Sequence, residues 1–136
     1  MRWEKVAETA LSDLMQGQVV SVTAGDPVAV AAAAMVKHKT GSALVMQGRL
    51  LVGILTERDV LRAAASGTDL TQAPVAGWMT KDPESAAPDT TVQEAAQLML
   101  LHGFRHLPVL RGREVCGVVS LRDLFAARIS RPAQRS

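Results

Sequence analysis

The sequence predicts a mixed α/β (α+β) fold made of two tandem β-α-β-β-α repeats related by a pseudo-twofold axis. Two observations predict it. The 136-residue chain aligns with itself without a gap at an offset of 64 residues, from Leu11–Ala64 onto Val75–Arg128. Each copy also shows the same order of apolar patterns, which alternate between strand and helix spacing. One copy alone buries too little surface, so we expect the two to pack sheet to sheet around a joint core.

Each element of a repeat follows from its local pattern. The first copy predicts in order a strand, a helix, two strands and a helix: Val19–Thr23, Val28–His38, Ala43–Met46, Leu50–Leu55 and a segment ending near Ala65. The second copy predicts the matching helix, hairpin and final helix at Val92–His102, Leu107–Leu110, Glu114–Val119 and onward to about Arg128. Gly48 and Gly112 suit the hairpin turns. Asp89 or Thr90 is expected to cap the helix of the second copy.

These patterns define the expected domain organisation. We place the first repeat at residues 11–66, a polar linker at 67–74 and the second repeat at 75–129. An N-terminal helical segment, residues 1–14, precedes the first repeat, and its amphipathic part is Trp3–Leu14. The tail, residues 130–136, is expected to be disordered.

Composition narrows the class of protein. The chain is 48% hydrophobic and carries a net charge of +2 with both signs spread along it, which is globular and lacks the basic stripe of a nucleic-acid-binding protein. No apolar run is long enough to span a membrane, and the first residues lack a signal peptide, so we expect a cytoplasmic protein. The single cysteine, Cys116, lies in an apolar strand and is interpreted as a buried thiol.

One short motif occurs in both copies, at Gly53–Asp59 and Gly117–Asp123. It reads Gly, two apolar residues, Thr or Ser, two residues and Asp, at the point where a strand ends and a helix begins. Thr56 with Asp59, or Ser120 with Asp123, can form a helix capping box. The same groups can also bind a nucleotide, because the helix N-terminus attracts phosphate and the carboxylate accepts from ribose hydroxyls. The spacing leaves both interpretations open.

Two such motifs in register, within this order of elements, resemble the CBS domain, and the pair resembles a Bateman module. The resemblance extends over roughly Leu11–Arg128 and is supported by Met15, Met79 and the run His106–Val109. It implies a non-catalytic regulatory sensor that binds AMP, ADP or ATP in the cleft between the repeats. It also implies a homodimer, joined through the helices, that signals to an unknown effector protein. S-adenosylmethionine and NAD are alternative ligands.

The resemblance also assigns site residues. Asp59 and Asp123 would hold ribose, and Thr56 and Ser120 would lie near phosphate. The remaining candidates comprise two base contacts, two phosphate contacts and two residues lining the adenine pocket: Thr23 and Ala87, Arg105 and His106, Leu107 and Pro108.

The two expected sites are unequal. Gly41 and Ser42 stand in the first repeat where the second has Arg105 and His106, so we expect the second site to bind more tightly. Arg58 and Arg122, one residue before each Asp, either reach phosphate across the pseudo-twofold axis or point to solvent.

The sequence gives less support to other classes of protein. A metal site at His38, His102 and His106 is disfavoured, because His102 ends a helix, His106 begins a strand and no Cys/His cluster accompanies them. No acid–base pair is apparent beyond the repeated Asp, so no catalytic residues are assigned. The main alternative is an interaction or dimerisation module without a physiological nucleotide.

Overall fold

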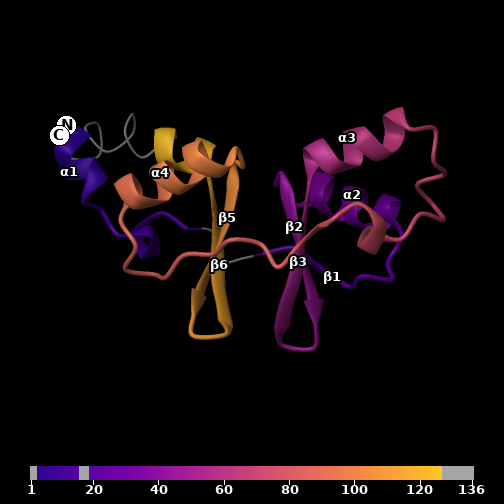
Figure 1. Cartoon of the computed structure of the whole chain (residues 1–136), viewed down its shortest axis with the longest axis horizontal. Helices are drawn as coiled ribbons and strands as arrows, with labels where there is room; N and C mark the ends of the chain where they lie inside the picture. Colours follow the sequence, from indigo (N-terminus) through magenta and orange to yellow (C-terminus); the bar gives the residue numbers. More distant parts are fainter. Residues whose placement is uncertain (1–2, 16–18, 127–136) are drawn as a thin grey trace. The chain divides into compact units, whose positions relative to one another are not determined.

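The computed structural model describes residues 3–15 and 19–126, arranged in two compact units (Figure 1). The first-repeat unit comprises residues 19–83. The second-repeat unit comprises residues 1–18 together with 84–136. Each unit has its own buried apolar cluster. The predicted mixed α+β architecture with two tandem repeats is confirmed, whereas the joint core stays a prediction.

The first-repeat unit is built on a four-stranded sheet of order β1-β2-β3-β4. Its strands are β1 (Ser21–Val22), β2 (Ser42–Gln47), β3 (Leu50–Thr56) and β4 (Thr80–Lys81). β1 runs parallel to β2, and the other pairs are antiparallel. Its helical segments are α2 (Val28–Lys37), α3 (Glu57–Ala65) and the single 3₁₀ turn η2 (Val75–Gly77).

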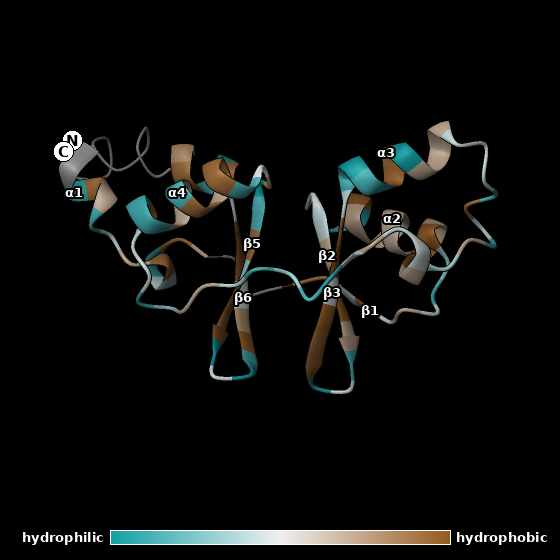
Figure 2. Cartoon of the chain, in the orientation of Figure 1, coloured by the Kyte–Doolittle hydropathy of each residue, from teal (hydrophilic) through white to brown (hydrophobic). Residues whose placement is uncertain are grey.

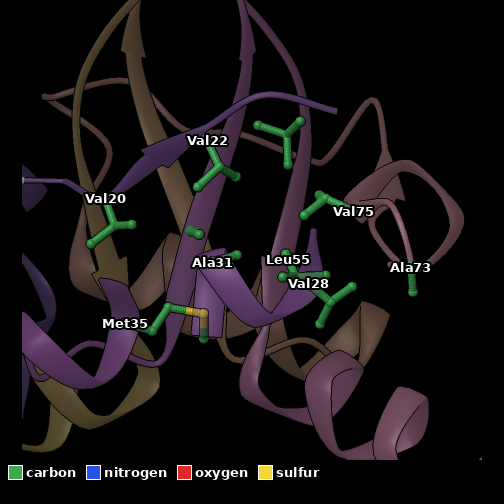
Figure 3. Close-up of a cluster of buried hydrophobic side chains, with 10 residues drawn as sticks. Val20, Val22, Val28, Ala31, Met35, Leu55, Ala73 and Val75 are labelled. Carbon is green, nitrogen blue, oxygen red and sulfur yellow. The ribbon is translucent and has the colours of Figure 1, made fainter. Parts of the chain in front are cut away.

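The apolar pattern explains where the core of this unit lies. Strands β2 and β3 form a hairpin around Gly48, whose φ of 60° suits the turn. Figure 2 shows the strands of the hairpin coloured largely as hydrophobic and its turn as hydrophilic. Side chains from β1, β2, β3 and α2 meet in the buried cluster of Figure 3, where Val28, Ala31 and Met35 supply the helical face. The i, i+3, i+7 spacing of these three residues is what predicted the helix.

The second-repeat unit repeats this plan. It contains α4 (Val92–His102), the hairpin β5 (His106–Arg111) and β6 (Glu114–Ser120), and a helix that begins at Leu121. An isolated parallel bridge between Ala86 and Val109 takes the place of the β1–β2 pairing. The unit also contains α1 (Trp3–Ala7) and the 3₁₀ turn η1 (Leu11–Asp13). The expected disordered tail lies outside the described residues.

Each compact unit contains the segment that precedes the other repeat in the sequence. Residues 3–15, here called the first lead-in, pack against α4, and Val6 and Leu11 are fully buried in the cluster of the second-repeat unit. Residues 67–79, here called the second lead-in, place Ala73 and Val75 in the cluster of the first-repeat unit. Leu11 and Val75 are equivalent in the repeat alignment, so the exchange is reciprocal.

Backbone hydrogen bonds fix both lead-ins at the same places. The first amide of α4, Val92 N, donates to the Thr9 carbonyl at 2.9 Å, and Leu11 N donates to the Thr90 carbonyl at 2.8 Å. The equivalent bonds in the other unit run from Val28 N to Ala73 O at 2.9 Å and from Val75 N to Asp26 O at 2.8 Å. A helix leaves its first N–H groups without intrahelical partners, and here the lead-in accepts from one of them.

The cap of α4 corrects the sequence prediction. Thr91, not Asp89 or Thr90, is the N-cap residue, and it forms a capping box with Glu94. Thr91 N donates to Glu94 Oε1 at 3.0 Å, and Glu94 N donates to Thr91 Oγ1 at 3.2 Å. The Thr90 hydroxyl accepts instead from Ala87 N at 3.0 Å, which closes the preceding turn.

We predict that Leu11→Ala destabilises the protein by about 2–5 kcal/mol through the second-repeat unit, because it empties a fully buried position there. Hydrogen exchange measures where the loss falls. The Val92 amide should lose protection while the Val28 amide keeps it, and the matched variant Val75→Ala should show the reverse. Loss of protection at Val28 in Leu11→Ala would contradict the exchange of lead-ins.

The Glu94 box also predicts a pH dependence. Hydrogen bonds from the backbone and side chain of Thr91 hold the pKa of Glu94 below its ordinary value of 4.5. A carboxylate whose pKa is lowered by folding stabilises the fold above 4.5, and that contribution is lost as the pH falls through the lowered pKa. Urea midpoints should therefore differ between wild type and Glu94→Gln at neutral pH, and the difference should shrink below pH 4.5. A constant difference would contradict this role.

Candidate functional site

The first copy of the repeated motif forms a capping box at the start of α3. Asp59 Oδ2 accepts from Thr56 N at 2.8 Å and from Thr56 Oγ1 at 3.0 Å. Asp59 N donates to Thr56 Oγ1 at 3.4 Å. Asp59 is buried, at 7% exposure. The capping box therefore holds a buried carboxylate at the N-terminus of α3.

The second copy has the same geometry. Asp123 Oδ2 accepts from Ser120 N at 2.8 Å, and Asp123 N donates to Ser120 Oγ at 3.1 Å. The capping interpretation of both motifs is therefore confirmed. The box occupies one oxygen of each carboxylate, and within the described residues Oδ1 of Asp123 has no hydrogen-bond partner. Capping thus leaves this oxygen available to a ligand.

The residue before each hairpin lies next to the helix that follows the hairpin. Leu121 N donates to the Arg105 carbonyl at 2.8 Å, and His106 is paired with Ser120 in the β5–β6 register. Arg105, His106, Ser120 and Asp123 therefore gather at one end of the hairpin. The Arg105 side chain is exposed. Because the backbone carbonyl of Arg105 accepts from the first amide of the helix, a positively charged residue adjoins the positive end of the helix dipole, which attracts anions.

The equivalent place in the first-repeat unit lacks that charge. Glu57 N donates to the Gly41 carbonyl at 2.9 Å, and Ser42 is paired with Thr56. The backbone is the same as in the other unit, but Gly41 has no side chain to offer and Ser42 is buried.

The candidate base-contact residues follow the first strand of each unit. Thr23 N donates to Asp26 Oδ2 at 2.9 Å, and the Ala87 amide makes the equivalent bond to Thr90. Thr23 is exposed, so its hydroxyl is accessible. Leu107 is fully buried in the cluster of the second-repeat unit, and Pro108, also buried, alternates with it along β5. Leu107 therefore serves the core of its unit.

Arg58 and Arg122 are exposed on the first turns of their helices, and neither makes an ion pair within the described chain. This exposed position is compatible with a contact to a bound phosphate. It is equally compatible with a side chain that points to solvent.

Sequence reasoning missed Arg62. Its Nη1 atom donates to Asp59 Oδ1 at 2.8 Å, and its Cζ atom lies 5.6 Å from the centroid of the Trp78 ring. The signal was the i, i+3 spacing of Asp59 and Arg62 on a helix, which brings such side chains together.

The glycine that begins the first motif allows a close approach between strands. A Cβ at Gly53 would lie 2.6 Å from Met79 Sδ and 3.0 Å from the Thr80 carbonyl oxygen. Gly53 pairs with Lys81, so β4 can approach β3 only where no side chain intervenes. This explains the glycine structurally.

Two further properties concern the described residues. Over 3–15 and 19–126, no group of three or more His, Cys, Asp and Glu side chains is placed to hold a metal ion. No helix in the same stretches is long and apolar enough to cross a membrane.

Comparison with protein-family models identifies the family to which the repeated motif belongs. The model of the CBS domain matches residues 11–66 and again residues 75–130. The chain belongs to the CBS-domain family. Among curated relatives of this CBS pair, the CBS domain-containing protein YhcV of Bacillus subtilis is 34% identical over 123 residues, which cover 90% of this chain and 87% of YhcV. Inosine-5′-monophosphate dehydrogenase of Korarchaeum cryptofilum is 38% identical, but the match covers 79% of this chain and only 22% of the enzyme.

Solved structures resemble the CBS pair as a whole. A CBS domain protein of Pyrobaculum aerophilum, complexed with AMP, has a TM-score of 0.79 and 28% identity, covering 85% of this chain and 89% of its own. A hexameric CBS-CP12 protein from bloom-forming cyanobacteria has a TM-score of 0.81 and 28% identity, covering 86% of this chain and 69% of its own.

Proposed function

We propose that this CBS pair binds an adenine nucleotide, AMP, ADP or ATP, and acts as a non-catalytic regulatory sensor. Ligand occupancy is passed on to an effector protein. The observation that carries the proposal is the group at the end of the β5–β6 hairpin, where a helix N-terminus, a hydroxyl, a carboxylate and an exposed arginine lie together.

The chemistry of this group matches a nucleoside phosphate. Phosphate oxygens accept from the Ser120 hydroxyl and Arg105, and they are favoured by the helix dipole. Oδ1 of Asp123 accepts from a ribose hydroxyl while Oδ2 keeps its place in the capping box. One carboxylate therefore serves both the fold and the ligand.

The comparisons support a binding role over a catalytic one. The Pyrobaculum aerophilum structure contains AMP, so an adenine nucleotide is a ligand of a similar CBS pair. The dehydrogenase match covers about a fifth of that enzyme, so its activity does not transfer to this chain. S-adenosylmethionine and NAD remain the alternative ligands, and a ligand-free interaction module remains the alternative class.

The proposed sites are unequal, because Arg105 and His106 have Gly41 and Ser42 as their equivalents. We predict that Asp123→Ala and Arg105→Ala each weaken nucleotide binding, the latter by about 1.5–3 kcal/mol for a lost charge-assisted contact. Asp59→Ala should weaken it less. Calorimetric titration with AMP, ADP and ATP measures the affinity, and S-adenosylmethionine and NAD complete the panel.

The matched control is Arg113→Ala, an exposed arginine in the β5–β6 turn that removes the same charge at the other end of the hairpin. It should leave affinity unchanged. If the motif served capping alone, both Asp variants would lose stability by about 1 kcal/mol and affinity would not respond. Unchanged affinity in folded Asp123→Ala and Arg105→Ala would favour the interaction module.

The proposal includes a homodimer joined through helices. Val36 and Leu100 occupy equivalent positions on α2 and α4, and they are 79% and 80% exposed. Leu61 and Phe125, also equivalent, are exposed on the helices that follow the hairpins. Exposed apolar patches are typical of association surfaces, and here exposed apolar side chains recur at equivalent positions of both repeats. A second copy of the chain is the occupant that this internal repetition fits.

We predict a mass of twice the 14.5 kDa chain by light scattering at tens of micromolar. Val36→Glu combined with Leu100→Glu should give a monomer, because buried unpaired carboxylates oppose association. The control Leu50→Glu alters an apolar residue that is half exposed on β3, away from the helices, and should stay dimeric. A monomeric wild type would contradict the homodimer, and so would a sixfold mass like that of the cyanobacterial hexamer.

A further inference from the structure

Arg62 pairs with the carboxylate of the first copy of the motif, and this pair distinguishes the two copies. In the first-repeat unit, Asp59 Oδ2 is engaged by the capping box and Oδ1 accepts from Arg62 Nη1 at 2.8 Å. Both carboxylate oxygens therefore already have donors from the chain itself. The Asp59 side chain is only 10% exposed, whereas that of Arg62 is 58% exposed, so Arg62 covers the carboxylate from the solvent side.

Trp78 holds the arginine from its other side. The guanidinium carbon lies 5.6 Å from the Trp78 ring centroid, within the range of a cation–π contact. Trp78 packs against the buried cluster of the first-repeat unit, so its ring is a fixed platform. A guanidinium that both stacks and donates loses less freedom on pairing than one held at a single point.

Neither partner exists in the second copy. Ala126 occupies the position equivalent to Arg62, and Leu14 occupies the position equivalent to Trp78. Leu14 packs against the cluster of the second-repeat unit and carries no aromatic face. The backbone and capping box are repeated, but the arginine over the carboxylate is not.

We infer that Arg62 is a positioning residue that keeps the Asp59 carboxylate occupied and lowers the affinity of the first-repeat motif for a nucleotide. The inference rests on the proposed function. A ribose hydroxyl binding to Asp59 has to share or replace a hydrogen bond between two charged groups, which is stronger than the bond that a neutral hydroxyl donates to the same carboxylate. Arg62 thus acts on the ligand through Asp59, in addition to the missing Arg105 equivalent.

The test is a reciprocal exchange measured by calorimetric titration with AMP, ADP and ATP. In an Asp123→Ala background, which leaves the first-repeat motif intact, Arg62→Ala should raise affinity by up to about fivefold, the range of a partly exposed ion pair. Arg62→Lys should raise it less, because lysine retains a charge that can pair. In an Asp59→Ala background, Ala126→Arg should lower the affinity of the second motif by a similar factor.

Arg49→Ala, an exposed arginine in the β2–β3 turn, is the charge-matched control and should leave affinity unchanged. If Arg62→Ala weakens binding, Arg62 contacts phosphate and the inference is wrong. If it lowers the melting temperature without changing affinity, Arg62 has a structural role only and the inference again fails. If the wild type itself binds none of the three nucleotides, the proposed function fails and the inference falls with it.

Discussion

The hydrogen bonds between each lead-in segment and the start of a helix are the constraint on which both units depend. The first amide of α2 and the first amide of α4 donate to lead-in carbonyls, and Leu11 and Val75 fill the cores beneath. Neither unit consists of one sequence repeat alone. The stretches that match the family model and the compact units are therefore different divisions of the same chain.

The two units share the backbone of the hairpin and of the helix start that follows it, and they differ there in side chains. The glycine turns, the hairpin registers and the capped starts of the helices that follow the hairpins coincide under the 64-residue offset, which is why one motif geometry occurs twice. Single side chains around the motif differ between the two copies. Arg105 adds a charge to the second copy, and Arg62 covers a charge in the first. An internally duplicated scaffold thus carries the same motif twice with different side chains around it.

The sequence predicted the secondary-structure elements that follow from periodic or local residue patterns. The apolar spacing predicted α2 and α4, and the glycine turns predicted the two hairpins. The bounds of these elements were correct to within a residue or two. The cap of α4 was misplaced by one or two positions because three consecutive residues, Asp89 to Thr91, can all accept from a helix amide. The exchange of lead-ins was not predicted, since a periodic pattern shows which face is buried but not which element buries it. Arg62 was missed because a charged i, i+3 pair ordinarily marks a solvated helix face.

The exchange also orders events during synthesis. The first-repeat unit is continuous over residues 19–83, so all its strands and its lead-in are available once that stretch has emerged. The second-repeat unit needs residues 3–15 and residues 84–126 together. Domains fold as their chains become complete, so Val6 and Leu11 must wait, unburied, while roughly a hundred further residues are translated. The first lead-in is therefore left without its partners for longer during translation than the second lead-in, whose partners precede it in the chain.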